Sequence, residues 1–476
     1  MEVQRFELGQ ADARGGYMMT LSEASTVVGG ELHGNVTSFD SVSIDTRTLA
    51  PGGLFVAISG TMYDGHDFVA KSAESGAVGA MVSNLQPVSI PQIRVANTTE
   101  SLGKLANSWR EQFNIPVLAI TGSNGKTTVT RMVASILSEV GPCLAPQKSF
   151  NNHWGVPLTL LGLNNSHQFA VIEMGTNGPG EIGYLSKLTR PTIALINNVS
   201  AAHVEGLGDV QHISKAKSEI FTGMGRGGTA LINLDDPLHS EWQSHFSTCV
   251  PEGEILTFGS SVEAMVRYEQ VELDWQHAEF NLVIDQQTIH VMLPLPGIHN
   301  VLNATASAAL AFAAAVDLQS IQTGLEKITG APGRLRRSKG INGSELLDDS
   351  YNANPSSIMA AIDVLASYPG KKILVLGEMA ELGSAGPKFH RQIGVYARQK
   401  HLDLLYCYGS QTSELAISYV EGFGPDAVHI SDIDTLINDL TGHIHDNTAV
   451  LVKGSRSSRM ENIVARIATN SSIREP

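Results

Sequence analysis

The sequence predicts an α/β protein built from three consecutive segments. The chain has 476 residues, a length typical of two to four domains. Strand-like and helix-like stretches alternate along most of it, which favours parallel sheets with crossover helices. A glycine-rich turn near Gly122 joins a strand to a helix, and the Ala331–Gly333 turn interrupts the chain further on.

The first segment, about residues 19–113, is predicted to be a small α/β unit. Asp45 and Arg47 lie in a polar turn, where residue types alone favour a surface pair over a binding site. The expected elements are a helix that begins at Thr20, a strand at Leu54–Ile58, a helix from Asp64 to about Gly76, and a strand at Ala80–Val82.

The second segment, about residues 114–333, begins with an apolar run at Ile115–Ile120 that predicts a buried strand. Apolar residues at helical spacing from Val129 to Val140 predict the helix that follows. A loop of this kind binds phosphate through backbone N–H groups, a lysine and a helix N-terminus. The usual first glycine of such a loop is replaced by Ile120, so an ordinary glycine turn is the alternative. The loop residues are Gly122, Ser123, Asn124, Gly125, Lys126, Thr127 and Thr128.

Polar residues follow the next strands of this segment. Glu173 ends a strand at Phe169–Gly175, and His203 follows a strand at Thr192–Val199. Because ligands bind past the carboxyl ends of parallel strands, both could bind Mg²⁺ beside Lys126. A helix cap for Glu173 and a structural role for His203 remain open. Lys217 is interpreted from its neighbours as a solvent-facing helix residue, and after Ser261 short alternating strands predict an antiparallel inset.

The third segment, about residues 334–476, alternates again between strands and helices. The polar run Asp348–Pro355 follows a strand and precedes a helix, so it is either a plain turn or a ligand loop. The cationic loop Lys453–Arg459 suits a carboxylate or a phosphate. The expected strands are Glu345–Asp348, Lys372–Leu376, Leu402–Tyr406 and Thr448–Val452, and the expected helices include Pro355–Ala366 and Arg391–Gln399.

Composition narrows the class of protein. The formal net charge of −15 argues against nucleic acid as a bulk partner. Cys143, Cys249 and Cys407 show no metal or disulfide spacing, which fits a reducing compartment. Residues 1–17 lack the apolar core of a signal peptide, and no apolar run is long enough to span a bilayer. We therefore expect a cytoplasmic protein without membrane insertion.

Motifs along nearly the whole chain beyond residue 18 resemble those of the Mur ligase family. They span all three segments: TGSNGKTT, NNHWGVPLTLL, VIEMGTNGPGEI, NNVSAAHVEGLG, AKSEIF, PGIHNVLNA, PGRLRR, LDDSYNANPSSIM, GEMAELG and VKGSRSSRME. The resemblance implies a UDP-binding first domain, a central ATP-binding domain with a shortened phosphate loop, and a Rossmann-like third domain. SIDTR, LFVAISG and DGHDF are similar to the UDP-binding module.

The resemblance also implies metal and nucleotide ligands. Lys126 would bind the ATP phosphates, while Thr127 and Glu173 would hold one Mg²⁺ between the β- and γ-phosphates. His203 would help to hold a second Mg²⁺, together with a carbamate formed from CO₂ on Lys217. Asn300 would contact the adenine or ribose, and Arg334 and Asp349 the phosphates and ribose. Substrate contacts would come from Thr46, Arg47, Asn151, Asn152, Tyr351, Asn352, Asn354, Lys453 and Arg456.

The activity implied by the resemblance is the joining of D-alanyl-D-alanine to UDP-N-acetylmuramoyl-tripeptide, at the last cytoplasmic step of peptidoglycan precursor synthesis. ATP would first convert the tripeptide carboxylate into an acyl phosphate, and the dipeptide amine would then displace phosphate. A monomer is expected. The alternatives are a ligase that adds the third peptide residue, a folylpolyglutamate-type ligase, and a P-loop switch. A switch should have a D-x-x-G motif after a strand that ends in Asp, whereas the strand here ends in Glu173.

Overall fold

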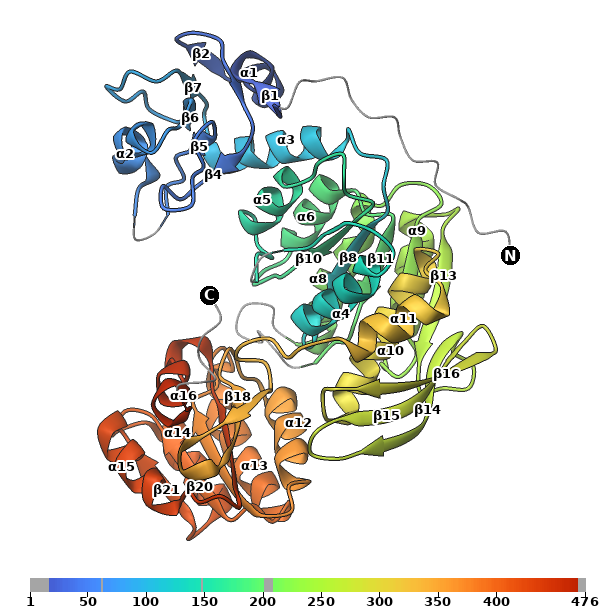
Figure 1. Cartoon of the computed structure of the whole chain (residues 1–476), viewed down its shortest axis with the longest axis vertical. Helices are drawn as coiled ribbons and strands as arrows, with labels where there is room; N and C mark the ends of the chain where they lie inside the picture. Colours follow the sequence, from blue (N-terminus) through green and yellow to red (C-terminus); the bar gives the residue numbers. More distant parts are fainter. Residues whose placement is uncertain (1–16, 61–62, 147–148, 201–208, 470–476) are drawn as a thin grey trace.

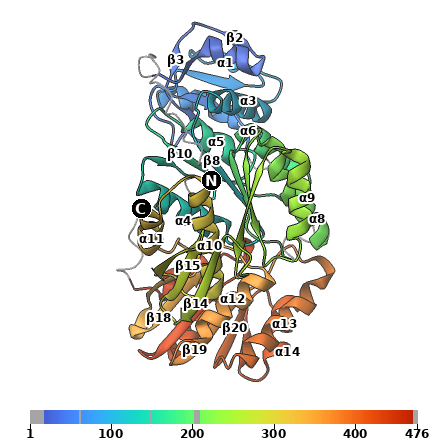
Figure 2. The same ribbon diagram turned by 90° about the vertical axis from the view of Figure 1, so that its right-hand side faces the viewer.

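The computed structural model describes residues 17–60, 63–146, 149–200 and 209–469. Three α/β parts follow one another along the long axis of the molecule (Figure 1) and remain distinct after a quarter turn (Figure 2). Their main sheets have five, nine and six strands. The α/β class and the three-domain arrangement predicted from the sequence are confirmed.

The first part has a five-stranded sheet in the order β2-β7-β6-β5-β4 and a separate β1–β3 pair. The predicted helix start is confirmed, because Thr20 Oγ1 accepts from Glu23 N and Glu23 Oε2 accepts from Thr20 N. The elements are β1 Met19–Thr20, α1 Leu21–Val28, β2 Glu31–His33, β3 Ser38–Phe39, β4 Val42–Ser43, β5 Leu54–Val56, the 3₁₀ helix Gly65–Phe68, α2 Val69–Glu74, β6 Gly79–Val82, β7 Gln92–Arg94 and α3 Thr98–Arg110.

The middle part has one nine-stranded sheet in the order β16-β15-β14-β13-β12-β11-β8-β10-β9. The strands from β9 to β14 pair in parallel, and β14, β15 and β16 are antiparallel to one another. The predicted inset is therefore antiparallel and extends this sheet. The strands are β8 Val117–Thr121, β9 Cys143–Leu144, β10 Phe169–Glu173, β11 Ile193–Ile196, β12 Thr229–Asn233, β13 Glu254–Gly259, β14 Val266–Leu273, β15 Ala278–Ile284 and β16 Gln287–Leu293. The helices are α4 Lys126–Ser138, α5 Gly155–Leu161, α6 Glu181–Thr189, α8 Val210–Ser218, α9 His239–Cys249, α10 Ile298–Ala313 and α11 Leu318–Glu326.

The third part has a six-stranded sheet in the order β17-β18-β22-β19-β20-β21, parallel except for β17. The helix predicted at Arg391–Gln399 begins earlier, at Gly386, because Pro387 occupies the first turn, where its missing N–H is tolerated. The elements are β17 Arg336–Lys339, β18 Glu345–Asp349, α12 Pro355–Ala366, β19 Lys371–Gly377, α13 Gly386–Gln399, β20 Leu404–Tyr408, α14 Glu414–Phe423, β21 Ala427–Ile430, α15 Ile433–His443, β22 Thr448–Lys453 and α16 Glu461–Ile467.

Helix α3 attaches the first part to the middle part. Its Trp109 Nε1 donates to Leu163 O at 3.0 Å, and its Arg110 Nε donates to Thr189 O at 3.0 Å. One continuous apolar core runs from α1 through α3 to α5, α6 and the face of the β8–β12 sheet behind them. The first two parts therefore share buried apolar surface, which holds them in one relative position.

The third part is attached differently, through the Gly330–Arg334 segment, through one tryptophan of the middle part and through polar contacts at the cavity. Trp275 lies at the β14–β15 turn of the middle part, yet it is 6% exposed and belongs to the apolar core of the third part. Its ring centroid is 4.8 Å from that of Tyr368, and the guanidinium of Arg337 lies 5.0 Å from the ring.

In the described ranges no helix has the length and apolarity to cross a membrane.

Candidate active site

A cavity of about 1080 Å³ lies between the middle and third parts. It is formed by the carboxyl ends of β8 and β10, the first turns of α4, α10 and α12, and the loop after β22. Most of the predicted site residues meet there. They are Ser123, Asn124, Gly125, Lys126, Thr127, Thr128, Asn151, Asn152, Glu173, Lys217, Asn300, Arg334, Asp349, Tyr351, Asn352, Asn354, Lys453 and Arg456.

Four predicted residues are not among the described lining of this cavity. Gly122 lies directly behind it, and its carbonyl accepts from Lys126 Nζ at 2.7 Å. Thr46 and Arg47 belong to the first part, where the 83% exposed Arg47 pairs with Asp45 at 2.6 Å. The surface pair expected from residue types is therefore present, and a role in substrate binding stays a prediction. His203 lies outside the described residues.

The glycine loop between β8 and α4 is tightly packed. Gly125 has a left-handed backbone with φ of 79°, a conformation that favours glycine. A Cβ atom there would lie 2.3 Å from Asn303 Oδ1 and 2.6 Å from Asn197 Nδ2, both side chains of the middle domain. Any larger residue at this position would displace the loop, so the glycine is required by the packing as well as by φ.

A network of asparagine side chains fixes the glycine loop. Asn124 O accepts from Asn197 Nδ2 at 3.0 Å and from Asn198 Nδ2 at 3.1 Å. Asn197 Nδ2 also donates to Asn303 Oδ1 at 2.9 Å, and Asn303 Nδ2 donates to Asn300 Oδ1 at 3.3 Å. Asn197 and Asn303 are absent from the predicted set. The spacing of Asn303 three residues after Asn300, on one helix face, is the signal that could have found it.

Glu173 ends β10 with a carboxylate that is 1% exposed. Its Oε1 accepts from Asn151 Nδ2 at 2.7 Å, whereas Oε2 is buried and has no hydrogen-bond partner among the described residues. A buried carboxylate oxygen is costly without a partner, and it is a ligand that Mg²⁺ prefers. Glu173 and the cavity-lining hydroxyl of Thr127 thus fit a hard cation. Within the described ranges, no three His, Cys, Asp or Glu side chains form a metal site.

Lys126 and Lys217 line the same cavity as this carboxylate. Burial lowers the pKa of Lys126, with a smaller contribution in the same direction from Arg334, while Glu173 opposes it. The solvent-facing interpretation of Lys217 is wrong, because its side chain is 2% exposed. Burial, and then the charge of Lys126, hold the pKa of Lys217 well below its usual range. No described acidic side chain forms an ion pair with Lys217, so its amine tends towards the neutral, nucleophilic form.

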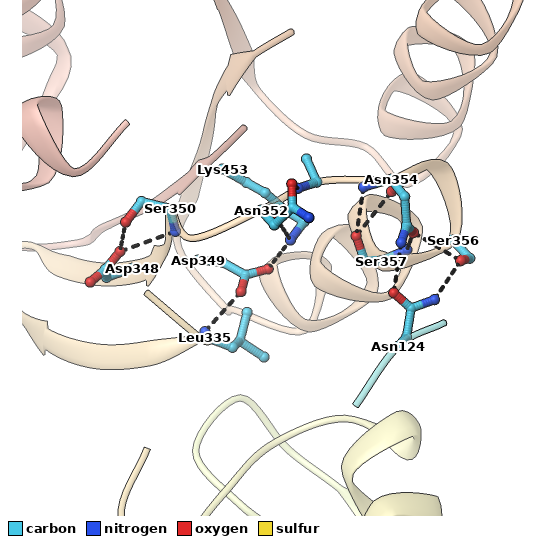
Figure 3. Close-up of polar contacts among 11 residues, drawn as sticks. Asn124, Leu335, Asp348, Asp349, Ser350, Asn352, Asn354, Ser356, Ser357 and Lys453 are labelled. Carbon is cyan, nitrogen blue, oxygen red and sulfur yellow. Dashed lines mark hydrogen bonds and ion pairs between the residues drawn. The ribbon is translucent and has the colours of Figure 1, made fainter. Parts of the chain in front are cut away.

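The third domain closes the cavity with two cationic groups. Lys453 is 3% exposed, forms an ion pair with Asp349 at 2.6 Å, and donates to Asn352 O at 2.8 Å (Figure 3). Arg334 lies 4.1 Å from the ring of Tyr351, and its Nη2 is 3.4 Å from Thr127 Oγ1. Lys453 thus has partners within the protein, while Arg334 reaches across to the first turn of α4.

Substituting Lys453 with methionine is expected to destabilise the third domain by about 3 kcal/mol, because the Asp349 carboxylate, which is only 13% exposed, would lose its cation. Chemical denaturation followed by circular dichroism measures this change. Lys400→Met is the matched control, since its pair with Asp363 at 2.6 Å is solvent-exposed and should contribute about 1 kcal/mol or less. Equal losses for the two variants would contradict the prediction.

His299, at the start of α10, gives a pH-dependent contribution to stability. Burial lowers its pKa to about 4; Asp349 opposes this shift and Lys453 adds to it. In the unfolded chain a histidine has a pKa of about 6.5. Between the pKa values of the folded and the unfolded chain, only the unfolded chain binds the proton. The contribution is complete above pH 6.5 and falls as the pH drops towards 4. Between about pH 6.5 and about pH 4, the free energy of unfolding should therefore fall less for His299→Gln than for the wild type. Chemical denaturation at several pH values measures this difference, and equal falls would contradict the prediction.

Models of known families match all three parts of the chain. The model described as Mur ligase family, catalytic domain, matches residues 38–110, Mur ligase middle domain matches 120–311, and Mur ligase, glutamate ligase domain matches 333–456. The matched ranges include the glycine loop, Lys217 and most of the third-domain residues that line the cavity. The chain therefore belongs to the Mur ligase family.

Individual relatives are similar over nearly their whole length. The UDP-N-acetylmuramoyl-tripeptide–D-alanyl-D-alanine ligase of Escherichia coli (strain K12) is 39% identical, over 95% of this chain and 99% of that protein. The enzyme of the same name from Bacillus subtilis (strain 168) is 32% identical, over 90% and 93%. A crystal structure of MurF from Acinetobacter baumannii superposes with a TM-score of 0.86 at 34% identity, covering 93% of this chain and 97% of that one. MurF from Thermotoga maritima in complex with ADP gives 0.78 at 26% identity, covering 90% and 96%.

Proposed function

We propose that this chain is the ATP-dependent ligase that joins D-alanyl-D-alanine to UDP-N-acetylmuramoyl-tripeptide in peptidoglycan precursor synthesis. The main support is the full-length similarity to relatives that carry this name, at up to 39% identity. The cavity agrees with it, since it places the glycine loop opposite the Asp349–Asn354 loop of the third domain. The protein is proposed to act in the cytoplasm as a monomer, without nucleic acid or membrane partners.

ATP is proposed to bind with its phosphates on the glycine loop. The ADP complex of the Thermotoga maritima relative supports nucleotide binding. Backbone N–H groups of Gly122–Thr128 and the Lys126 ammonium would contact the phosphates. Arg334 would add a second cation from the third domain, and Asn300 and Asp349 would contact the adenosine part. The inward-facing positions of Lys126 and Arg334 in the cavity agree with this orientation.

Two Mg²⁺ ions are proposed in the same region, and they would neutralise phosphate charge when bound. Thr127 and Glu173 would hold the first, which the unpartnered Oε2 of Glu173 supports. His203 and a carbamate on Lys217 would hold the second. The carbamate forms when the neutral amine attacks CO₂ and loses a proton, so the lowered pKa of Lys217 favours it.

The reaction is proposed to have two steps. The tripeptide carboxylate attacks the γ-phosphorus of ATP, releasing ADP and leaving an acyl phosphate. The neutral amine of D-alanyl-D-alanine then attacks the acyl carbon, phosphate leaves, and the nitrogen loses a proton. Because a free carboxylate lacks a good leaving group, phosphorylation is what makes the second step feasible. The chain contributes cations at the transferred phosphoryl group and orientation of the reactants.

Substrate contacts are proposed on both sides of the phosphates. Asn151 and Asn152 would face the sugar–peptide, and Thr46 and Arg47 in the first domain would contact the UDP end. On the third-domain side, the dipeptide would lie near a polar wall. That wall is formed by Tyr351, Asn352, Asn354, Lys453 and Arg456.

Phosphate release tests the proposal directly. The purified protein with ATP, Mg²⁺ and UDP-N-acetylmuramoyl-tripeptide should release phosphate continuously only when D-alanyl-D-alanine is added, with a stoichiometric gain of the pentapeptide product by mass spectrometry. Turnover with a single amino acid and UDP-N-acetylmuramoyl-dipeptide would instead indicate the ligase that adds the third residue. Turnover with a folate and glutamate would indicate the folylpolyglutamate-type alternative.

A further inference from the structure

One contact joins the glycine loop directly to the third domain across 230 residues of sequence. Asn354 Nδ2 donates to Asn124 Oδ1 at 2.7 Å (Figure 3). Asn124 Nδ2 in turn donates to Ser356 Oγ at 3.0 Å and to Ser200 Oγ at 3.1 Å. The Asn124 amide therefore bonds through both its oxygen and its nitrogen to the first residues of α12.

The main chain of Asn124 is fixed by the middle domain alone. Its N–H donates to Asn198 Oδ1 at 2.9 Å, and its carbonyl accepts from Asn197 and Asn198. The side chain of Asn124 thus extends from a rigid loop towards α12. A displacement of the third domain would break the side-chain bonds to Asn354 and Ser356 and leave these main-chain bonds intact.

Asn354 is the N-cap of α12, and its two amide atoms have separate partners. Its Oδ1 accepts from Ser357 N at 2.9 Å, which satisfies the helix start. Capping requires only an oxygen, and serine would supply one equally well. The amide nitrogen adds nothing to the cap, and its partner is Asn124. The longer amide side chain is therefore accounted for by the contact between domains.

The contact also sets where the third-domain wall lies. Tyr351 and Asn352 precede Asn354 on the same short loop, and both line the cavity. Holding Asn354 against Asn124 fixes this loop relative to the phosphate-binding backbone. For a reaction between groups bound on two domains, such orientation contributes directly to the rate.

We propose that Asn124 and Asn354 are positioning residues, whose mutual contact sets the third domain over the glycine loop for the second step, in which the dipeptide amine attacks the acyl phosphate and phosphate leaves. The inference rests on the proposed ligase function. It adds to that function a specific pair of side chains that holds the glycine loop and the polar wall of the third domain in a fixed relative position.

A double-mutant cycle tests the pair. Asn354→Ser keeps an N-cap oxygen but is too short to reach Asn124, and Asn124→Ala removes the other partner. Each single variant is expected to lower kcat for dipeptide ligation about tenfold, with little change in the KM for ATP or in the melting temperature. The double variant should be within about twofold of Asn124→Ala, because that single variant already lacks the contact with Asn354 as well as the bond to Ser356. Asp432→Ser, a similar substitution at the N-cap of α15 outside the cavity, is the control expected to keep wild-type kcat.

Small-angle X-ray scattering supplies a readout independent of catalysis. With ADP bound, both single variants should have a larger radius of gyration than the wild type. Single-variant effects on kcat that multiply in the double variant, or wild-type kcat in either single variant, would overturn the proposal. A wild-type protein that makes no pentapeptide would refute the proposed function instead, and the scattering comparison would still decide whether the contact holds the domains together.

Discussion

Replacing Lys217 with alanine is expected to reduce ligation by about a thousandfold, an effect comparable to the loss of a preorganised charged group at a transferring phosphoryl centre. Lys217 is buried beside Lys126 and lacks an acidic partner among the described residues. As an ammonium it would add a third cation beside Lys126 and Arg334, whereas as a carbamate it becomes an anion that can bind metal. Initial rates of phosphate release measure the loss.

Short carboxylic acids should partly restore the Lys217→Ala enzyme, because they fit the space left by the carbamate and carry the same charge. A rescue of about tenfold or more is expected with acetate or propionate, but none with a chloride salt of equal ionic strength. Lys215→Ala is the matched control, since this lysine lies on the same helix but is exposed. Full activity of Lys217→Ala without added acid would exclude the carbamate.

Substituting Glu173 with glutamine is expected to lower kcat about a hundredfold or more and to raise the Mg²⁺ concentration needed for half-maximal activity. The change keeps the shape of the side chain and its contact with Asn151, but removes the negative charge from the unpartnered Oε2. An amide is a weaker ligand for a hard cation than a carboxylate. Mg²⁺ titration of the steady-state rate measures the change.

Nucleotide binding without metal separates this effect from misfolding. In the presence of EDTA, Glu173→Gln should bind ADP at least as tightly as the wild type, because a buried anion near the phosphates has been removed. Weaker ADP binding in EDTA would indicate a distorted loop. An unchanged Mg²⁺ requirement would contradict the assignment of Glu173 as a metal ligand.

The fold was predictable wherever local signals are sharp. Helix α12 at Pro355–Ala366 has the bounds expected from the sequence, and strands β18 and β22 begin at the expected residues, Glu345 and Thr448. In α12, Asn354 and Pro355 supply the N-cap and the first-turn proline that define a helix start. No element is predicted over residues 98–110, although α3 forms there. Its apolar face becomes apparent only when α5 and α6 pack against it.

The site was predictable in part, for reasons visible at single residues. Glu173 ends β10, and Lys126 follows β8 after the Gly122–Gly125 turn, so the pairing of these two strands brings both residues to one edge of the sheet. Lys217 could not be placed from residue types, because its burial depends on tertiary packing and its helix also carries exposed polar residues. The resemblance to the family, not the pattern, singled it out. Asn197 was missed since a single asparagine at a strand end resembles many ordinary turns.

Trp275 has a consequence for how the third domain can move. Removing this indole from the core of the third domain would expose a side chain that is 6% accessible and in contact with Tyr368, at a cost of about 2–3 kcal/mol. The polar contacts at Asn124 and Arg334, on the cavity side, are individually weaker. The third domain should therefore move away from the middle domain by rotating about Trp275, so that the mouth of the cavity widens first. Because the indole stays buried throughout such a swing, its fluorescence would change little while the cavity mouth opens.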